Sequence, residues 1–228
     1  MWEVLDEPWR VCLEELWAGY CAGSVPHGAV VIGPDGRVLA RAHNRQVVRT
    51  GGSERDRVST PAPGPGGIAD LLAGHRLAHA ELIALLSFDP AAAGVDAAAC
   101  ALYTANEPCP LCAGATAMSG IRALHYAARD GYGGAAALLE AMPILRGRPV
   151  AVQGAADPLL EGAVIVMRVE YRLHRGPERA RTIRTAAKAI RPDAVAVADR
   201  LFAEAVLPRL RDDRVPAREA FDLVASRF

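Results

Sequence analysis

Three features are scarce or missing in this 228-residue sequence. Basic and acidic residues number 26 each, so the formal net charge is zero and no global field would gather a polyanion such as nucleic acid. Aromatic residues make up 5 % of the chain, although 51 % of it is hydrophobic. No apolar run reaches the roughly 20 residues of a membrane span, because the longest nearly uncharged stretch, 90–106, is interrupted by Gly94 and Asp96. We therefore expect a globular protein with no membrane partner.

The N-terminus and the cysteines indicate a compartment. The chain is acidic from Glu3 onward and lacks the basic segment and apolar core of a secretion signal, so we expect a cytoplasmic protein. Five cysteines are an odd number, and in a reducing compartment metal binding or free thiols are expected before disulfides. A chain of this length can bury a sizeable core without such cross-links.

Hydrophobic periodicity and turn residues predict an α/β fold. Pro34-Asp35-Gly36 supplies a turn between the first two strands, which predicts a hairpin. A helix between the last two strands implies parallel pairing with a right-handed crossover. Helices are predicted near 6–19, 68–88 with a break at Gly74, 108–119 and 135–142, and strands at 28–32, 38–40, 99–104, 121–127 and 149–152.

Two segments depart from the alternation of strands and helices. Residues 49–67 hold glycine, proline, serine, threonine and charged residues, which predicts a long loop. Beyond about residue 156 the patterns are all helical. We therefore divide the chain into a domain over 1–155, with an insertion at about 45–75, and a helical C-terminal extension over 156–228. The expected helices of the extension are 159–173, 180–190, 193–210 and 217–226.

Two short motifs carry chemistry. His79-Ala80-Glu81 precedes Pro108-Cys109-Pro110-Leu111-Cys112, and together they match the H-x-E and P-C-x-x-C signature of zinc deaminases. Two cysteines three residues apart on the first turn of a helix point the same way and can bind one tetrahedral ion. The helix start favours thiolates, which suit zinc better than harder ions. We therefore predict a zinc site with His79, Cys109 and Cys112 as ligands.

Glu81 gives this site a catalytic interpretation. Three protein ligands leave the fourth position of zinc for water, as in catalytic zinc sites. Glu81 is placed to take the proton of that water and deliver it to a substrate ring and then to departing ammonia. The motifs therefore predict a zinc-dependent hydrolytic deaminase.

Each motif alone also fits a site of another kind. A single C-x-x-C can be a redox pair or half of a structural zinc site. A closed structural site needs a fourth protein ligand, for which His75, Cys100 and His125 are candidates, and no second C-x-x-C exists to complete it. A non-catalytic, zinc-stabilised partner subunit is a further hypothesis, against which the presence of Glu81 argues.

At these motifs the sequence resembles the cytidine deaminase superfamily, and most closely the branch of tRNA adenosine deaminase, guanine deaminase and cytosine deaminase. The likeness covers roughly residues 10–155. Residues 25–31 are similar to the first strand of the family, and Asn44-Arg45 to the Asn-containing pair that follows its second strand. The resemblance implies a three-layer α/β/α fold with a mixed five-stranded sheet, a zinc cofactor and a homodimer.

The resemblance also implies residues that contact the substrate. Asn44 would hydrogen-bond the substrate base, and the backbone around Ala80 and Pro108 would border the reacting ring. His27 stands where relatives often have Val or Phe, which suggests a more polar pocket wall. Asn44 can equally be a turn cap, and His27 a turn histidine before a strand.

The loop 130–133 also bears on the shape of the pocket, so Asp130 and Tyr132 join the candidate substrate-binding residues. The stretch 45–78 is much longer than its counterpart in tRNA adenosine deaminase, and a lid over a small pocket would account for it. We therefore expect a small aminoheterocycle, with guanine as one candidate, and water as the substrates.

A tRNA-editing deaminase is the alternative to a small-molecule enzyme. The segment 168–191 is rich in arginine, which can track phosphates, but such arginines more commonly form a solvated helix face. Aromatic residues that could stack on bases are nearly absent there. The sequence therefore disfavours tRNA and leaves the identity of the substrate open.

Overall fold

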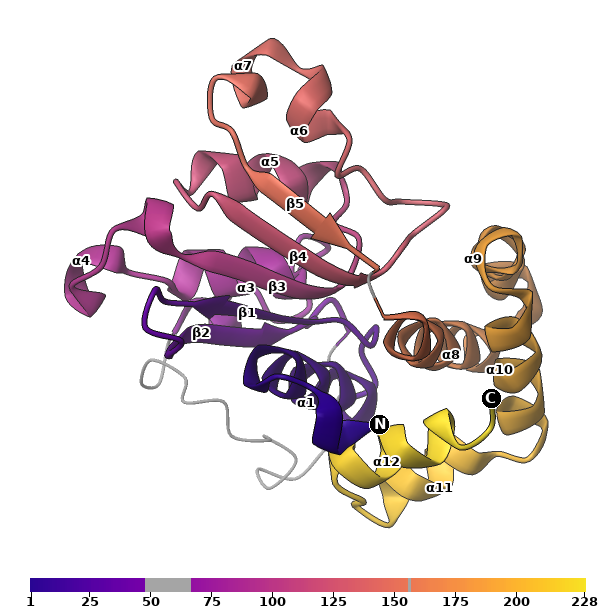
Figure 1. Cartoon of the computed structure of the whole chain (residues 1–228). Helices are drawn as coiled ribbons and strands as arrows, with labels where there is room; N and C mark the ends of the chain where they lie inside the picture. Colours follow the sequence, from indigo (N-terminus) through magenta and orange to yellow (C-terminus); the bar gives the residue numbers. More distant parts are fainter. Residues whose placement is uncertain (48–66, 156) are drawn as a thin grey trace.

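A mixed five-stranded sheet forms the centre of the computed structural model, which describes residues 1–47, 67–155 and 157–228 (Figure 1). The strand order is β2-β1-β3-β4-β5. Strand β1 pairs antiparallel with β2 and β3, whereas β3, β4 and β5 are parallel to one another. The predicted hairpin and the predicted parallel pairing of the last two strands are therefore confirmed. The strands are Gly28–Ile32 (β1), Val38–His43 (β2), Ala101–Asn106 (β3), Ala123–Ala128 (β4) and Ala151–Gly154 (β5).

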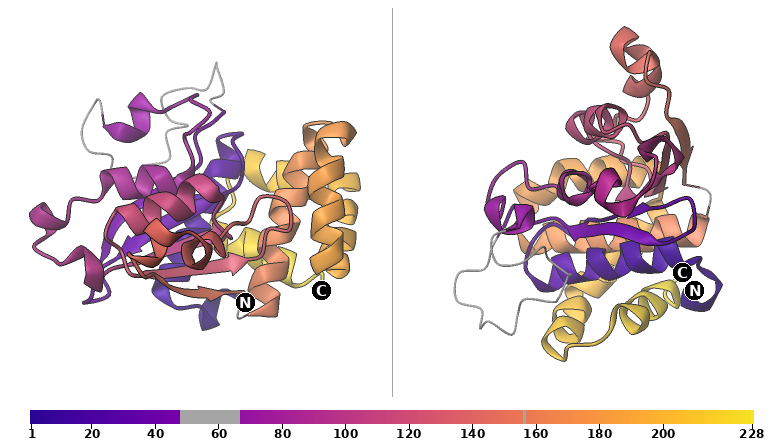
Figure 2. Two further views of the ribbon diagram at one scale, coloured as in Figure 1. Left: turned by 90° about the horizontal axis from the view of Figure 1, so that it is seen from above. Right: turned by 90° about the vertical axis from the view of Figure 1, so that its left-hand side faces the viewer.

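Helices cover both faces of this sheet, which confirms the predicted three-layer α/β/α architecture. On one face, α1 (Glu7–Cys21) packs on β1, β2 and β3, and α8 (Pro158–His174) packs on β4. On the other face lie α3 (Ala80–Ser87) and α5 (Pro110–Met118). Figure 2 shows the indigo α1 on one side of the strands and the magenta helices on the other.

The contact between α1 and β1 is so close that it requires a glycine. A Cβ atom at Gly28 would overlap the backbone of Cys12 and Leu16 on α1. The Cys12 thiol donates to the Gly28 carbonyl across the same junction, with 3.2 Å between sulfur and oxygen. A larger residue at position 28 would therefore push the helix off the sheet.

Several element boundaries differ from the sequence predictions. A short 3-10 helix, η3 (Ala97–Ala99), is capped by Asp96, so β3 begins two residues later than predicted. The helix predicted over 135–142 is shorter, α6 (Leu138–Ala141), and Pro143 then begins a further short helix, α7 (Pro143–Arg146), because proline suits the first turn of a helix. The remaining short elements are η1 (Trp2–Val4), α2 (Ile68–Leu71) and α4 (Pro90–Ala93). The predicted loop over 49–67 lies almost entirely outside the described residues.

The C-terminal part is helical, as predicted, with one additional break. Ala205 adopts a left-handed conformation, with φ of 49°, and so divides the predicted helix 193–210 into two. This part follows α8 with α9 (Pro177–Ile190), α10 (Pro192–Ala203), α11 (Val206–Asp212) and α12 (Ala217–Ala225). Among the helices of the described residues, none has the length and apolar character needed to cross a membrane.

Two apolar clusters lie on the two faces of the sheet. One joins Ala29, Leu102 and Leu124 to the inner faces of α3 and α5. The other joins α1 and the sheet to α8, α10 and α12, and it includes Leu13, Val164 and Phe221, which are at most 1 % exposed. The domain boundary at residue 155 stays a prediction, and we note that the C-terminal helices share this second cluster with α1.

We expect Phe221→Ala to lower the free energy of unfolding of the whole chain by about 3–5 kcal/mol, because it removes a fully buried ring from the shared cluster. Guanidinium denaturation followed by circular dichroism should show one transition at a lower midpoint. Phe228→Ala, at a ring that is 45 % exposed, is the control and should cost less than half as much. An early, separate transition in Phe221→Ala would contradict a shared core.

Candidate active site

Two helix N-termini bring the motif residues together. His79 is the N-cap of α3 and Glu81 lies in its first turn. Cys109 is the N-cap of α5 and Cys112 lies in the first turn of that helix. Because α3 and α5 pack side by side on one face of the sheet, their starts meet close to the end of β3.

The three predicted ligands form a compact cluster. The Cys109 Sγ and Cys112 Sγ atoms are 3.6 Å apart. The Nδ1 atom of His79 lies 3.6 Å from the Cys109 sulfur and 3.5 Å from the Cys112 sulfur. Among the described residues, these three form the group of histidine, cysteine and acidic ligand atoms that can hold a metal ion.

The spacing of these atoms fits zinc. In a tetrahedron with zinc–sulfur bonds of about 2.3 Å and zinc–nitrogen bonds of about 2.0–2.1 Å, two sulfurs lie about 3.8 Å apart and a sulfur and a nitrogen about 3.6 Å apart. The distances between the three side chains are within about 0.2 Å of these values. Their mixed nitrogen and sulfur donors are also those that zinc prefers.

The electrostatics of the cluster favour a thiolate. The hydrogen bond between Cys109 and Cys112, together with the one between Cys109 and His79, lowers the pKa of the Cys109 thiol to about 4. The hydrogen bond with Cys109 and burial raise the pKa of Cys112. The hydrogen bond to Cys109 raises the pKa of His79. A bound cation would favour deprotonation of both sulfurs.

Glu81 lies in the same enclosed region and keeps one oxygen free of protein partners. Its side chain is 2 % exposed, and its Oε1 atom accepts a hydrogen bond of 3.2 Å from the Thr104 hydroxyl. The Oε2 atom is buried without a hydrogen-bond partner among the described residues. Burial raises the pKa of this carboxyl group. A buried carboxylate with one fixed and one unpartnered oxygen is suited to exchanging a proton with a bound molecule.

Asn44 is buried and held in one orientation. Its Oδ1 atom accepts from the Ser24 hydroxyl at 2.8 Å and from the backbone amide of Gln46 at 3.0 Å, while its Nδ2 atom donates to Gln46 Oε1. Gln46 Nε2 also lies 3.2 Å from His79 Nε2, so Asn44 is linked to the metal cluster through one side chain.

His27 lies beside Asn44 at the start of β1. The backbone carbonyl of His27 accepts a hydrogen bond of 3.0 Å from the backbone N–H of Asn44. The ring Nε2 atom of His27 is buried without a hydrogen-bond partner among the described residues. Burial, assisted by the charge of Arg168, lowers the pKa of His27 to about 3, so the ring is neutral. In the pairing of β1 with β3, Ala29 lies opposite Thr104, and the same register leads on to His27 and Asn106. The Nδ2 atom of Asn106 is also buried and unpartnered in the described part of the chain.

The other predicted substrate-binding residues lie at different distances from the cluster. Ala80 and Pro108 are buried and directly adjoin the ligands His79 and Cys109 in the chain. Asp130 is partly buried and holds the turn that follows β4. The Tyr132 side chain is 65 % exposed, and its backbone amide bonds to Asp130. Contact of these residues, and of His27 and Asn44, with a substrate stays a prediction.

The candidates for a fourth protein ligand have other partners. Cys100 donates to the Asp96 carbonyl, and the His125 ring stacks on Tyr103 with centroids 4.3 Å apart. His75 accepts from the backbone amide of Leu77 at 3.1 Å. None of these three belongs to the metal cluster of the described residues, so the geometry gives no support to a closed structural site.

Four polar residues of this region do not stand out in the sequence. Thr104 lies in the buried strand β3 and donates to Glu81, and Asn106 immediately precedes the Glu107-Pro108 pair, so their proximity to the motifs is a usable signal. Gln46 likewise follows Asn44 by two residues. Arg168, which donates to Asn106 from α8, is 62 residues away and gives no local signal.

The chain is similar to a deaminase family model and to solved deaminase structures. The family model described as the cytidine and deoxycytidylate deaminase zinc-binding region matches residues 4–128. A solved structure of a tRNA:A34 deaminase that performs A-to-I editing at the wobble position is 27 % identical, with 64 % of this chain and 95 % of that chain covered and a TM-score of 0.47. A guanine deaminase from Nitrosomonas europaea is 26 % identical, with 74 % and 85 % covered and a TM-score of 0.46.

Cys109→Ala and Cys112→Ala should each abolish stoichiometric zinc binding, because two remaining ligands cannot complete the site. The amount of zinc per chain is measured by inductively coupled plasma mass spectrometry on protein purified from cells grown in zinc-supplemented medium. Cys21→Ala, which changes a half-buried cysteine outside the cluster, is the matched control and should keep the metal. Full zinc content in both cluster variants would refute the ligand assignment.

Proposed function

This chain belongs to the cytidine and deoxycytidylate deaminase family, and we propose that the substrate of its hydrolytic deamination is a small nucleobase-like ring. The reaction converts a ring carbon that bears an amino group, plus water, into a carbonyl and ammonia. The observation that carries the proposal is the unpartnered, buried Glu81 Oε2 atom beside the cluster of His79, Cys109 and Cys112.

Each side chain of the cluster has a distinct role in this reaction. His79, Cys109 and Cys112 would hold a zinc ion, which would supply a Lewis acid that makes water nucleophilic at neutral pH. Glu81 accepts one proton from the attacking water at Oε2 and passes it to a ring nitrogen, and it then transfers the second proton of that water, from the new hydroxyl group, to the leaving amino group. Thr104 donates to Oε1 and so keeps the other oxygen directed at the reacting atoms.

Asn44 is proposed to orient the ring. One N–H of its Nδ2 atom is used by Gln46, and an amide group has a second N–H that remains to donate to a ring acceptor. The bonds from Ser24 and Gln46 to Oδ1 fix which end of the amide carries the donor. His27 and the backbone at Ala80 and Pro108 complete the proposed surroundings of the ring.

The charges of the C-terminal helices support a small substrate over tRNA. Several arginines of the basic stretch are engaged by carboxylates, which leaves less positive charge for phosphates. These pairs are Arg168–Asp130, Arg181–Glu178, Arg184–Asp199 and Arg191–Asp193. Guanine is one candidate, and a tRNA editing activity remains the alternative substrate class.

Glu81→Gln should retain zinc and reduce ammonia release by about 10²–10⁴-fold, because it removes the proton acceptor without removing a ligand. The measurement is an ammonia-release screen of the wild-type protein across purine and pyrimidine bases, nucleosides, pterins, triazines and tRNA, repeated for the variant on the best substrate. Glu140→Gln, at an exposed carboxylate on α6, is the control. Undiminished turnover by Glu81→Gln would reject the mechanism, and turnover of tRNA alone would reject the proposed substrate class.

We propose that two copies of the chain pair through the outer faces of α3 and α5. Leu86 and Met118 are 53 % and 58 % exposed there, and they line an apolar depression of about 400 Å³. Side chains of this size are costly to leave in water over a contiguous area, and an isologous contact would bury them. The homodimer implied by the family resemblance is thus given a specific surface.

The double variant Leu86→Glu, Met118→Glu should be a monomer at concentrations where the wild type is a dimer, because four carboxylates would face one another in a buried contact. Sedimentation velocity measures the mass. Val4→Glu, which changes another exposed apolar side chain away from these helices, should leave the wild-type mass unchanged. A dimeric double variant or a monomeric wild type would refute this surface.

A further inference from the structure

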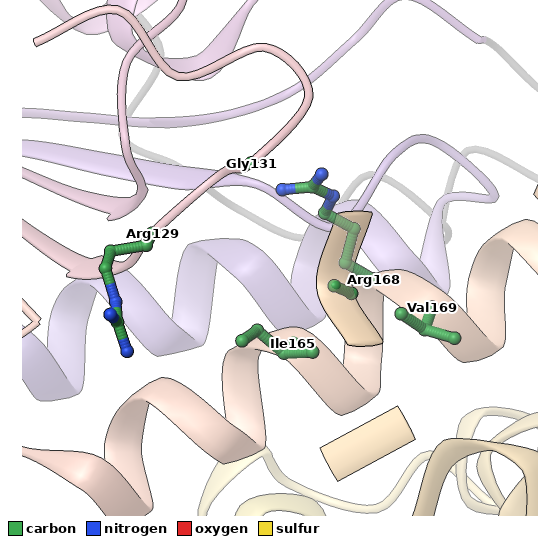
Figure 3. A pocket seen from close by; sticks show the side chains of 6 residues that line it. Arg129, Gly131, Ile165, Arg168 and Val169 are labelled. Carbon is green, nitrogen blue, oxygen red and sulfur yellow. The ribbon is translucent and has the colours of Figure 1, made fainter. Parts of the chain in front are cut away.

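A buried arginine of the C-terminal part extends to the end of the sheet that carries the active site. Arg168 lies on α8 and is 6 % exposed. Its Nη2 atom donates to Asp130 Oδ1 at 2.7 Å, and its Nη1 atom to Asn106 Oδ1 at 3.3 Å. Asn106 ends β3 and Asp130 follows β4, so one guanidinium joins the ends of two neighbouring parallel strands. Figure 3 shows Arg168 directed from α8 toward the segment of Gly131, while Arg129 points away.

The Asp130 oxygen that accepts a hydrogen bond from Arg168 also organises a turn. Asp130 Oδ1 also accepts the backbone amides of Tyr132 at 2.9 Å and Gly133 at 3.1 Å. Although burial opposes ionisation, the charge of Arg168 keeps the pKa of Asp130 below its ordinary value. Arg168 therefore neutralises the carboxylate that shapes the segment 130–134.

This segment is bonded in turn to the residues that precede a zinc ligand. The Glu107 carboxylate accepts the backbone amides of Asp130 at 3.2 Å and Ala136 at 3.3 Å. The Ala135 amide donates to the carbonyl of Pro108 at 2.9 Å. Pro108 is covalently joined to Cys109, so a continuous series of bonds runs from α8 to the first cysteine of the cluster.

The packing around this series leaves little room for movement. A Cβ at Gly131 would lie 3.2 Å from Ile190 Cδ1 and 3.3 Å from the Ala186 carbonyl on α9. A Cβ at Gly134 would overlap the Glu107 carboxylate. The cavity between Gly131, Arg168 and their neighbours has a volume of about 10 Å³, which is at most one water molecule. This junction is therefore a tight mechanical contact and not a ligand pocket.

We propose that Arg168 is a positioning residue of the active site, which acts through Asp130 and the segment 130–136 to hold Glu107, Pro108 and the zinc ligand Cys109 in place. The inference rests on the proposed zinc ligands and goes beyond the proposed reaction, because it gives the C-terminal helices a role in the site. It requires no contact between Arg168 and the substrate.

The test compares Arg168→Met with Arg168→Lys and with Arg184→Met. Methionine keeps the apolar stem but leaves Asp130 and Asn106 without the guanidinium, whereas lysine keeps the charge. Arg184 on α9 forms the same kind of pair, with Asp199, so its variant controls for the loss of an arginine–carboxylate pair.

Hydrogen exchange of the full-length zinc-loaded protein, read by mass spectrometry, is the first measurement. Peptides over 129–136 and 107–109 should exchange roughly tenfold faster or more in Arg168→Met, because a charged hydrogen bond that closes the segment is lost. Arg168→Lys should restore part of the protection, and Arg184→Met should leave both peptides unchanged. Zinc release to an excess of chelator should be faster by a similar factor in Arg168→Met alone.

The outcomes separate this inference from a general loss of stability. If peptides throughout α8, α10 and α12 exchange faster by the same factor as 129–136, Arg168 is a stability residue and the inference fails. Wild-type exchange at 107–109, or wild-type zinc release, in Arg168→Met also overturns it. Should Arg168→Met not fold, Asp130→Asn removes the charge of the partner and must give the same local pattern for the inference to stand.

The double variant Arg168→Met, Asp130→Asn adds a check of coupling. Its effect on exchange should be no larger than that of Arg168→Met alone, because the Arg168–Asp130 ion pair that both changes break is already lost in Arg168→Met, and the side-chain amide introduced by Asp130→Asn can still accept the backbone amides of Tyr132 and Gly133. Additive effects would show that the two residues act separately and would refute the series of bonds. Hydrogen exchange and zinc release are both measured without turnover. Undiminished ammonia release by Glu81→Gln would reject the proposed reaction and would leave these two measurements unaffected, so the two failures are distinguishable.

Discussion

The meeting of two helix N-termini on one face of the sheet is the constraint on which the site depends. A tetrahedral ion requires its ligands about 3.6–3.8 Å apart, a tolerance of a few tenths of an ångström. The chain supplies one ligand from the cap of α3 and two from the start of α5, and their atoms are 3.5–3.6 Å apart. Such precision cannot come from flexible loops, and it is supplied by the two helices packed on strands of fixed spacing. The buried alanines of this face, among them Ala84 and Ala113, let the helices approach closely.

A second requirement is to keep charge in a region from which water is largely excluded. Cys112 and Glu81 are at most 2 % exposed, so an uncompensated charge on either would be costly. The donor set of His79, Cys109 and Cys112 calls for a divalent cation, whose charge would compensate that of bound thiolates. Glu81 keeps an unpartnered oxygen in this environment, which is unfavourable for folding alone and for which the proposed proton transfer would account.

The sequence predicted the parts of the site that depend on local spacing. The H-x-E and P-C-x-x-C motifs fixed the ligands because neighbours in a helix turn are neighbours in space, and the structure places them together. Strand and helix types followed from periodicity, but the boundaries differed by up to several residues, for example where the cap Asp96 delayed β3 or the left-handed Ala205 divided a predicted helix. The bonds from Ser24 and Gln46 to Asn44 depend on how a loop folds, which periodicity does not describe. The contact of Arg168 with Asn106 depends on how an entire helical layer docks, and no short-range pattern encodes it.

The docking of α8 has one favourable register because its polar residues are buried along with its apolar face. Glu161, Arg168 and Glu170 are 3 %, 6 % and 0 % exposed on this helix. Each has a partner in an earlier part of the chain: Glu161 pairs with Arg129, Arg168 with Asp130, and Glu170 with the Tyr20 hydroxyl. An apolar face alone could slide by a turn at small cost, whereas a slide of α8 would leave buried charges unpaired at several kcal/mol each. The same polar contacts that fix the helix therefore fix the segments 129–130 and 106–108, which ties the geometry of the metal site to the docking of the C-terminal layer.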